Sequence, residues 1–152
     1  MLGSDLRQTL VMLADTMREA RDPWWVISSA AVALHGVTPI RVGDVDVLMS
    51  VRDAWRTMAR LGVIPANDAA GPMFRSAVFG QWTATPLLVE IMAGIHVAAA
   101  DRWTEVLLRT RLPVLVEGSA VYVPDRAELA AMLRSFGRPK DLERARLLTS
   151  QA

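Results

Sequence analysis

The 152-residue sequence has no cysteine, a single lysine, and no apolar run that approaches the length needed to cross a membrane. The absence of cysteine excludes disulfide bonds and cysteine-ligated zinc sites. A net charge of +1 gives the chain no general attraction to the phosphates of nucleic acids. The N-terminal residues mix charged and apolar side chains, unlike a signal peptide, so we expect a cytoplasmic protein with no membrane partner.

The composition is typical of a chain that folds around one substantial core. Hydrophobic residues make up 52% of the sequence. A chain of 152 residues is long enough for one such core and short for two. We therefore expect one domain over residues 1–152.

Apolar periodicity and turn residues predict a chain in which helices and strands are mixed, which is the α/β (α+β) class. Expected helices, their caps included, cover residues 4–21, 28–35, 50–61, 101–110, 125–136 and 139 onward. Their N-terminal caps include Ser4, Ser50 and Asp125. Expected strands cover residues 24–27, 44–49, 73–79, 87–92, 113–116 and 120–123, with connections at 65–72 and 80–86.

The most informative segment is an apolar run that carries two carboxylates, residues 43–49 (GDVDVLM). Side chains two residues apart in a strand point to the same face, which places Asp44 and Asp46 a few ångströms apart. Two like charges on an apolar strand repel each other and lose hydration. A divalent metal ion offsets this cost best, although an exposed strand edge or an arginine salt bridge would also relieve it.

Four motifs surround this pair in a definite order. Residues 27–29 (ISS) precede an alanine-rich segment at 30–36, Arg41 follows in a loop, the aspartate pair comes next, and Glu90 lies in a later apolar run. This order resembles the nucleotidyltransferase superfamily, the DNA polymerase beta-like fold. Its members have an apolar-Gly-Gly/Ser turn, an aspartate pair in a strand, and a third carboxylate on a later strand. The resemblance implies a small mixed, twisted sheet flanked by helices.

The resemblance also implies an Mg²⁺-dependent enzyme that moves a nucleoside monophosphate from an NTP to an acceptor, which can be a small molecule, a protein or an RNA end. Asp44, Asp46 and Glu90 would be its catalytic and metal-binding residues, with two Mg²⁺ ions possible and Mn²⁺ as a substitute. Glu90 would complete the second metal site or act as general base. A structural interpretation also stays open, in which Glu90 is a partly buried acid paired with a nearby arginine such as Arg75.

The residues that the resemblance implies for nucleotide binding are Ser28, Ser29, Arg41, Arg138 and Lys140. The last two lie in the segment 137–142 (GRPKDL), which is similar to small bacterial members of the superfamily, including AbiEii-type proteins. Each group has an alternative role. The two serines can simply cap a helix, and the two basic residues can complement Asp141 and Glu143 on a solvated face.

Two positions depart from the family pattern. Ser28 replaces the first glycine of the turn, and Leu133 lies where many relatives have a lysine, with Arg134 facing another side of the same helix. These departures favour a second hypothesis, a catalytically weakened binding module that has a protein partner in a toxin-antitoxin or defence pair. The intact set of three carboxylates favours the enzyme, because a chain without metal would be more stable if it lost their repulsion.

Overall fold

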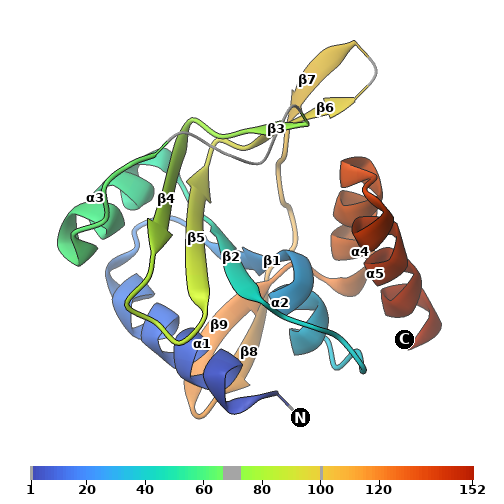
Figure 1. Cartoon of the computed structure of the whole chain (residues 1–152), viewed down its shortest axis with the longest axis horizontal. Helices are drawn as coiled ribbons and strands as arrows, with labels where there is room; N and C mark the ends of the chain where they lie inside the picture. The colour runs from blue at the N-terminus through green and yellow to red at the C-terminus, as the bar shows by residue number, and fades with distance from the viewer. Residues whose placement is uncertain (1, 67–72, 100) are drawn as a thin grey trace.

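A four-stranded mixed sheet lies at the centre of the molecule in a computed structural model, which describes residues 2–66, 73–99 and 101–152 (Figure 1). Its strand order is β1-β2-β5-β4. The four strands are β1 (Trp25–Ile27), β2 (Asp44–Leu48), β4 (Val78–Trp82) and β5 (Leu88–Ala93). β2 and β5 are parallel, whereas β1 and β4 are antiparallel to their neighbours. The predicted mixed sheet and its class are therefore confirmed.

Helices cover this sheet and extend from it: α1 (Ser4–Thr16) with the 3-10 turn η1 (Met17–Glu19), α2 (Ser28–Leu34), α3 (Val51–Leu61), α4 (Arg126–Phe136) and α5 (Pro139–Ser150). α4 and α5 pack against each other and against α2, on the side of the molecule opposite α3 (Figure 1). None of the helices in the described part of the chain is long and apolar enough to span a bilayer.

Local capping signals place the ends of α3 and α4. Ser50 Oγ accepts a hydrogen bond from the Asp53 amide at 3.2 Å, and Asp125 Oδ1 accepts one from the Glu128 amide at 2.7 Å, as predicted. The prediction for Ser4 was wrong. Ser4 is the first residue of α1, the preceding glycine is the N-cap, and no side chain caps this helix end.

Two smaller sheets complete the fold. The first contains β3 (Phe74–Arg75), β6 (His96–Ala99) and β7 (Arg102–Glu105), and the second contains β8 (Leu112–Val116) and β9 (Ser119–Val123). The predicted hairpin at 113–123 is confirmed. The predicted helix at 101–110 was wrong, because β7 pairs along its length with β6, and Trp103 and Thr104 suit an extended chain.

The segment predicted as one strand at 73–79 is divided between β3 and β4, and β4 continues through Gly80 to Trp82. Gly80 is therefore in a strand rather than in a connection. A Cβ at this position would lie 2.5 Å from Met58 Sδ and 2.9 Å from Val63 Cγ1, so close packing from α3 and the residues after it requires glycine. The predicted connection at 65–72 lies mostly outside the described residues.

Candidate active site

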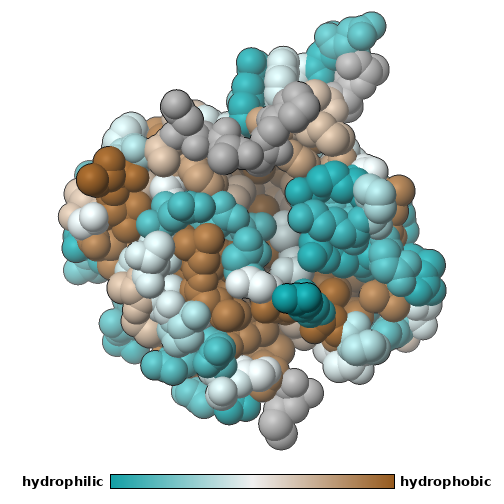
Figure 2. Space-filling view, in the orientation of Figure 1, coloured by the Kyte–Doolittle hydropathy of each residue, from teal (hydrophilic) through white to brown (hydrophobic). Residues whose placement is uncertain are grey.

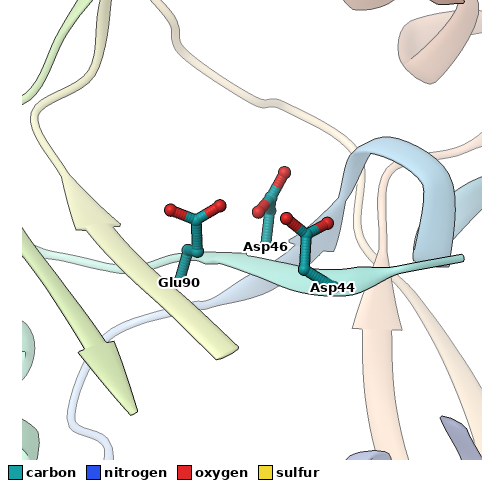
Figure 3. A group of neighbouring side chains, drawn as sticks. All are labelled: Asp44, Asp46 and Glu90. Carbon is teal, nitrogen blue, oxygen red and sulfur yellow. The ribbon is translucent and has the colours of Figure 1, made fainter. Parts of the chain in front are cut away.

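The carboxylates of Asp44, Asp46 and Glu90 converge on one point beside the central sheet (Figure 3). Asp44 and Asp46 flank the fully buried Val45 along β2, so both side chains project from the other face of the strand. The parallel pairing of β2 with β5 sets Glu90 directly opposite Asp46. One oxygen atom from each carboxylate lies within 4.8 Å of the others. The predicted convergence is present, and these oxygens could hold a metal ion.

The surroundings of Asp46 disfavour its negative charge. Its Oδ1 atom is buried and has no hydrogen-bond partner among the residues that the structure describes. Burial, followed by the charges of Asp44 and Glu90, raises the pKa of Asp46 from 3.8 to about 7, while a hydrogen bond with Ser28 and the charge of Arg138 act in the opposite direction. A divalent cation fits this donor set, because it would contact the unpaired oxygen and offset the repulsion between the carboxylates.

A cavity of about 260 Å³ opens beside the carboxylates. Ser28 and Ser29 line it at the start of α2. Three basic residues of the α5 region, which we call the cationic wall, also line it: Arg138, Lys140 and Arg144. The apolar part of the lining consists of Ile27, Phe74, Phe79, Met92, Ile95 and Phe136. In Figure 2 the surface over α4 and α5 is largely hydrophilic. The cavity therefore joins anionic, cationic and apolar surfaces at one place.

The cavity contains all but one of the site residues expected from the sequence. Arg41 is the exception, since it is exposed in the loop before β2 and does not line the cavity. Arg144 lines the cavity and was not predicted. It follows Lys140 by four residues on α5, and this helical spacing is the signal that could have identified it.

Among comparisons with known proteins, only the comparison of structures finds similar proteins. No protein-family model matches the sequence, and no curated protein matches it. The structure is similar to the candidate nucleotidyltransferase TM1012 from Thermotoga maritima, with a TM-score of 0.75 and 23% identity, over 100% of this chain and 97% of that chain. The fold is that of the nucleotidyltransferases.

Two further solved structures share the nucleotidyltransferase fold with this chain. One is the lincosamide antibiotic adenylyltransferase LnuA with lincomycin bound, with a TM-score of 0.63 and 9% identity, over 95% of this chain and 96% of that chain. The other is ANT(2'')-Ia in complex with adenylyl-2''-tobramycin, with a TM-score of 0.60 and 13% identity, over 96% and 90% of the two chains.

Ser28 occupies a backbone conformation that normally favours glycine. Its φ is +57°, in the left-handed region, and the residue is buried at the start of α2. A side chain in this conformation costs about 1–2 kcal/mol relative to glycine. The position where the nucleotidyltransferase pattern has its first glycine therefore keeps a glycine-like backbone while carrying a hydroxymethyl group. The alternative role as a helix cap is wrong, because Ile27 is the N-cap of α2 and no side chain caps that end.

Arg138 pairs with Asp141, as the structural alternative for the basic residues proposed. Lys140 and Glu143 are exposed, as that alternative expects, but Asp141 is not on a solvated face. The Arg138 Nε and Nη2 atoms lie 2.6 and 3.1 Å from the two carboxylate oxygens of Asp141, which is fully buried. Glu143 instead accepts hydrogen bonds from Arg146, from Nη2 at 2.6 Å and from Nε at 2.8 Å. Arg138 therefore both anchors the start of α5 and lines the cavity.

The remaining sequence alternatives concern Arg75 and the position of the missing lysine. The Arg75 guanidinium lies 4.3 Å from the centre of the Trp103 ring, and Arg75 does not line the cavity. Leu133 is fully buried in the core. Arg134 is exposed, and its Nη2 donates to Thr149 Oγ1 at 3.2 Å, so it does not replace the lysine at the cavity. The positive charge beside the carboxylates comes from α5 and its N-cap instead.

Proposed function

We propose that this chain is a Mg²⁺-dependent nucleotidyltransferase that moves a nucleoside monophosphate from an NTP to an acceptor hydroxyl. The observation that carries the proposal is the meeting of three carboxylates beside the cationic wall, one of them with a buried oxygen that has no hydrogen-bond partner among the described residues. Without a bound cation, the hydrogen bond from Ser28 and the charge of Arg138 would offset the disfavoured charge of Asp46 only in part, because its pKa stays raised.

The residues divide the reaction between them. Asp44 and Asp46 would hold Mg²⁺, or Mn²⁺ in its place, and a bound ion would supply positive charge where negative charge develops on the phosphates. The acceptor oxygen forms a bond to the α-phosphorus while the bond to the oxygen bridging the α- and β-phosphates breaks, and pyrophosphate leaves. The Glu90 carboxylate receives the proton of the acceptor hydroxyl. Positioning and charge account for most of this catalysis.

The cationic wall suits the phosphates of the nucleotide. Guanidinium groups match phosphate oxygens in pairs, and Lys140 adds a mobile point charge. Ser29 lies at the start of α2, where the first backbone amides have no partner within the helix. Arg41 lies outside the cavity lining, in the exposed loop before β2, and its proposed role is limited to neutralising pyrophosphate as the pyrophosphate leaves.

The acceptor we propose is a small molecule with a hydroxyl group. LnuA was solved with lincomycin, and ANT(2'')-Ia with adenylyl-2''-tobramycin. In this chain Phe79 and Met92 line the cavity together with Glu90, so an apolar part of an acceptor can pack beside the proposed base.

The second candidate is a catalytically weakened module that binds nucleotide and has a protein partner in a toxin-antitoxin or defence pair. The similarity of residues 137–142 to AbiEii-type proteins suggested this candidate. Two observations favour it: the Cβ of Ser28 at the glycine position, and the buried Leu133 at the lysine position.

A transfer assay separates the two candidates. ATP labelled at the α-phosphate is incubated with Mg²⁺ or Mn²⁺ and a panel of hydroxyl-bearing small molecules, and release of pyrophosphate is followed in parallel. If the chain is an enzyme, we expect labelled product, and we expect Asp46→Asn to abolish it. Asp15→Asn should not, because Asp15 is an exposed aspartate outside the segments that line the cavity. Nucleotide binding without any transfer would favour the weakened module.

A further inference from the structure

Asp141 is a fully buried carboxylate directly behind the cationic wall. Its oxygens accept from Arg138 three times, from Nε at 2.6 Å, from Nη2 at 3.1 Å and from the backbone amide at 3.3 Å. Arg144 Nη1 lies 3.9 Å from Asp141 Oδ1. A buried charge is costly unless it is paired, so the aspartate and the arginines fix one another.

The Arg138 side chain is held on a second side by an aromatic pair. Its guanidinium carbon lies 4.9 Å from the centre of the Phe74 ring, in cation–π geometry. Phe74 in turn meets Phe136 edge to face, with ring centres 4.9 Å apart and planes at 87°. Contacts with Asp141 of α5 and Phe74 of β3 therefore restrict a side chain that is otherwise among the most flexible in proteins, and Phe136 of α4 supports Phe74 from behind.

This restraint matters because Arg138 and Asp46 line the same cavity. The charge of the guanidinium already acts on the Asp46 carboxylate, whose buried Oδ1 atom has no hydrogen-bond partner in the part of the chain that the structure describes. A guanidinium and a carboxylate form a strong charge-assisted pair when they can reach each other. An Arg138 side chain released from Asp141 would have an unpaired oxygen to bind, and the resulting ion pair would occupy the place of a metal ion.

We propose that Asp141 is a positioning residue that holds Arg138, and with it Arg144, on the α5 side of the cavity, where both face the nucleotide phosphates and neither occupies the metal site. This inference rests on the proposed function and extends that function to Asp141, a residue that would contact neither nucleotide nor metal.

Mn²⁺ binding, followed through the paramagnetic resonance signal of the free ion, tests the proposal without any need for turnover. We expect Asp141→Asn to weaken Mn²⁺ binding about tenfold, a coupling typical of contacting charged groups. Arg138→Gln alone should leave the Mn²⁺ affinity within about threefold of the unmodified chain. The double variant should regain the affinity that Asp141→Asn lost, because the competing guanidinium is gone.

ATP binding in the presence of Mn²⁺ should respond differently. Both single variants should lose affinity for ATP, and the double variant should not regain it, because Arg138 is itself a phosphate contact. A merely structural role for Asp141 predicts instead that the double variant binds Mn²⁺ as poorly as Asp141→Asn, and this result would overturn the proposal.

The NMR signal of the Arg138 Nε–H group distinguishes direct contact from long-range charge. In the Asp141→Asn background, adding Asp46→Asn should shift this signal, whereas in the unmodified background it should not. An unshifted signal in both backgrounds contradicts the proposal. If Asp141→Asn fails to fold, Asp141→Glu can replace it, because it keeps the charge but shifts the carboxylate away from its present contacts with Arg138. We then expect Arg138→Gln to restore the Mn²⁺ affinity that Asp141→Glu loses. Failure of the unmodified chain to bind Mn²⁺ would refute the proposed function, whereas unrescued variants of a chain that binds it refute only the positioning role.

Discussion

Replacing Asp46 with asparagine should stabilise the metal-free protein at alkaline pH, although the residue lies at the centre of the proposed site. The folded protein raises the pKa of Asp46 from 3.8 to about 7, chiefly through burial. The native state therefore binds more protons than the unfolded chain across this interval, and stability falls as the pH rises through it. Asparagine has a similar shape and never ionises, so the variant avoids this loss.

The size of the effect follows from the shift. A rise of about 3 units in pKa at about 1.4 kcal/mol per unit corresponds to about 4 kcal/mol of lost stability once the carboxylate is fully ionised. This value is an upper limit, because water and counter-ions reach an opened cavity and because the asparagine amide also needs partners. We expect Asp46→Asn to exceed the unmodified chain by about 1–3 kcal/mol at about pH 8. At about pH 4 the difference should be small, because this pH is close to the unfolded-state pKa of 3.8 and ionisation has cost little stability there.

Urea denaturation in the presence of a chelator measures this difference at both pH values. Asp15→Asn serves as the matched control, because that carboxylate is exposed and its replacement should change stability by less than about 0.5 kcal/mol. An Asp46→Asn variant that is equally stable or less stable than the unmodified chain at alkaline pH would refute the electrostatic argument for the site.

Three further predictions concern the metal and two backbone positions. Mn²⁺ affinity should rise as the pH increases from about 6 to 8, because the ligand carboxylate must lose its proton, and a pH-independent affinity measured by titration calorimetry would speak against Asp46 as ligand. Ser28→Gly should raise the free energy of unfolding by about 1 kcal/mol through relief of the positive φ. A lower melting temperature for this variant would show that the hydroxyl contact outweighs the strain. Gly80→Ala should cost about 1–3 kcal/mol in urea denaturation because its Cβ meets Met58, whereas Gly43→Ala, which has open space, should not. Equal effects at the two glycines would contradict this packing argument.

Features governed by nearby residues could be predicted from the sequence. The caps at Ser50 and Asp125 were identified correctly because a cap needs only a side chain and an amide three residues later. The aspartate pair was equally visible, since strand alternation fixes the face of each side chain. The contribution of Glu90 depended on the resemblance, because the register between β2 and β5 is a long-range property.

Features governed by tertiary packing could not be predicted in the same way. Residues 101–110 have the composition of a helix, yet pairing with β6 draws Arg102–Glu105 into a strand. Gly80 on its own favours a turn. The neighbouring Met58, which leaves no space for a Cβ, is the reason that a glycine occupies this strand position, and the sequence does not show this contact. The burial of Asp141 likewise depends on the packing of α5 against α4 and α2, so its pairing with Arg138 could be proposed from the sequence but its enclosure could not.

The most direct test of the central claim is a crystal structure of this chain soaked with Mn²⁺ and a non-hydrolysable ATP analogue, with anomalous scattering to locate the metal. We expect a manganese peak bonded to oxygens of Asp44 and Asp46 and next to the Glu90 carboxylate, with the phosphates of the analogue against Arg138 and Lys140. Nucleotide density without a metal peak at the carboxylates, or an arginine guanidinium between them, would contradict it.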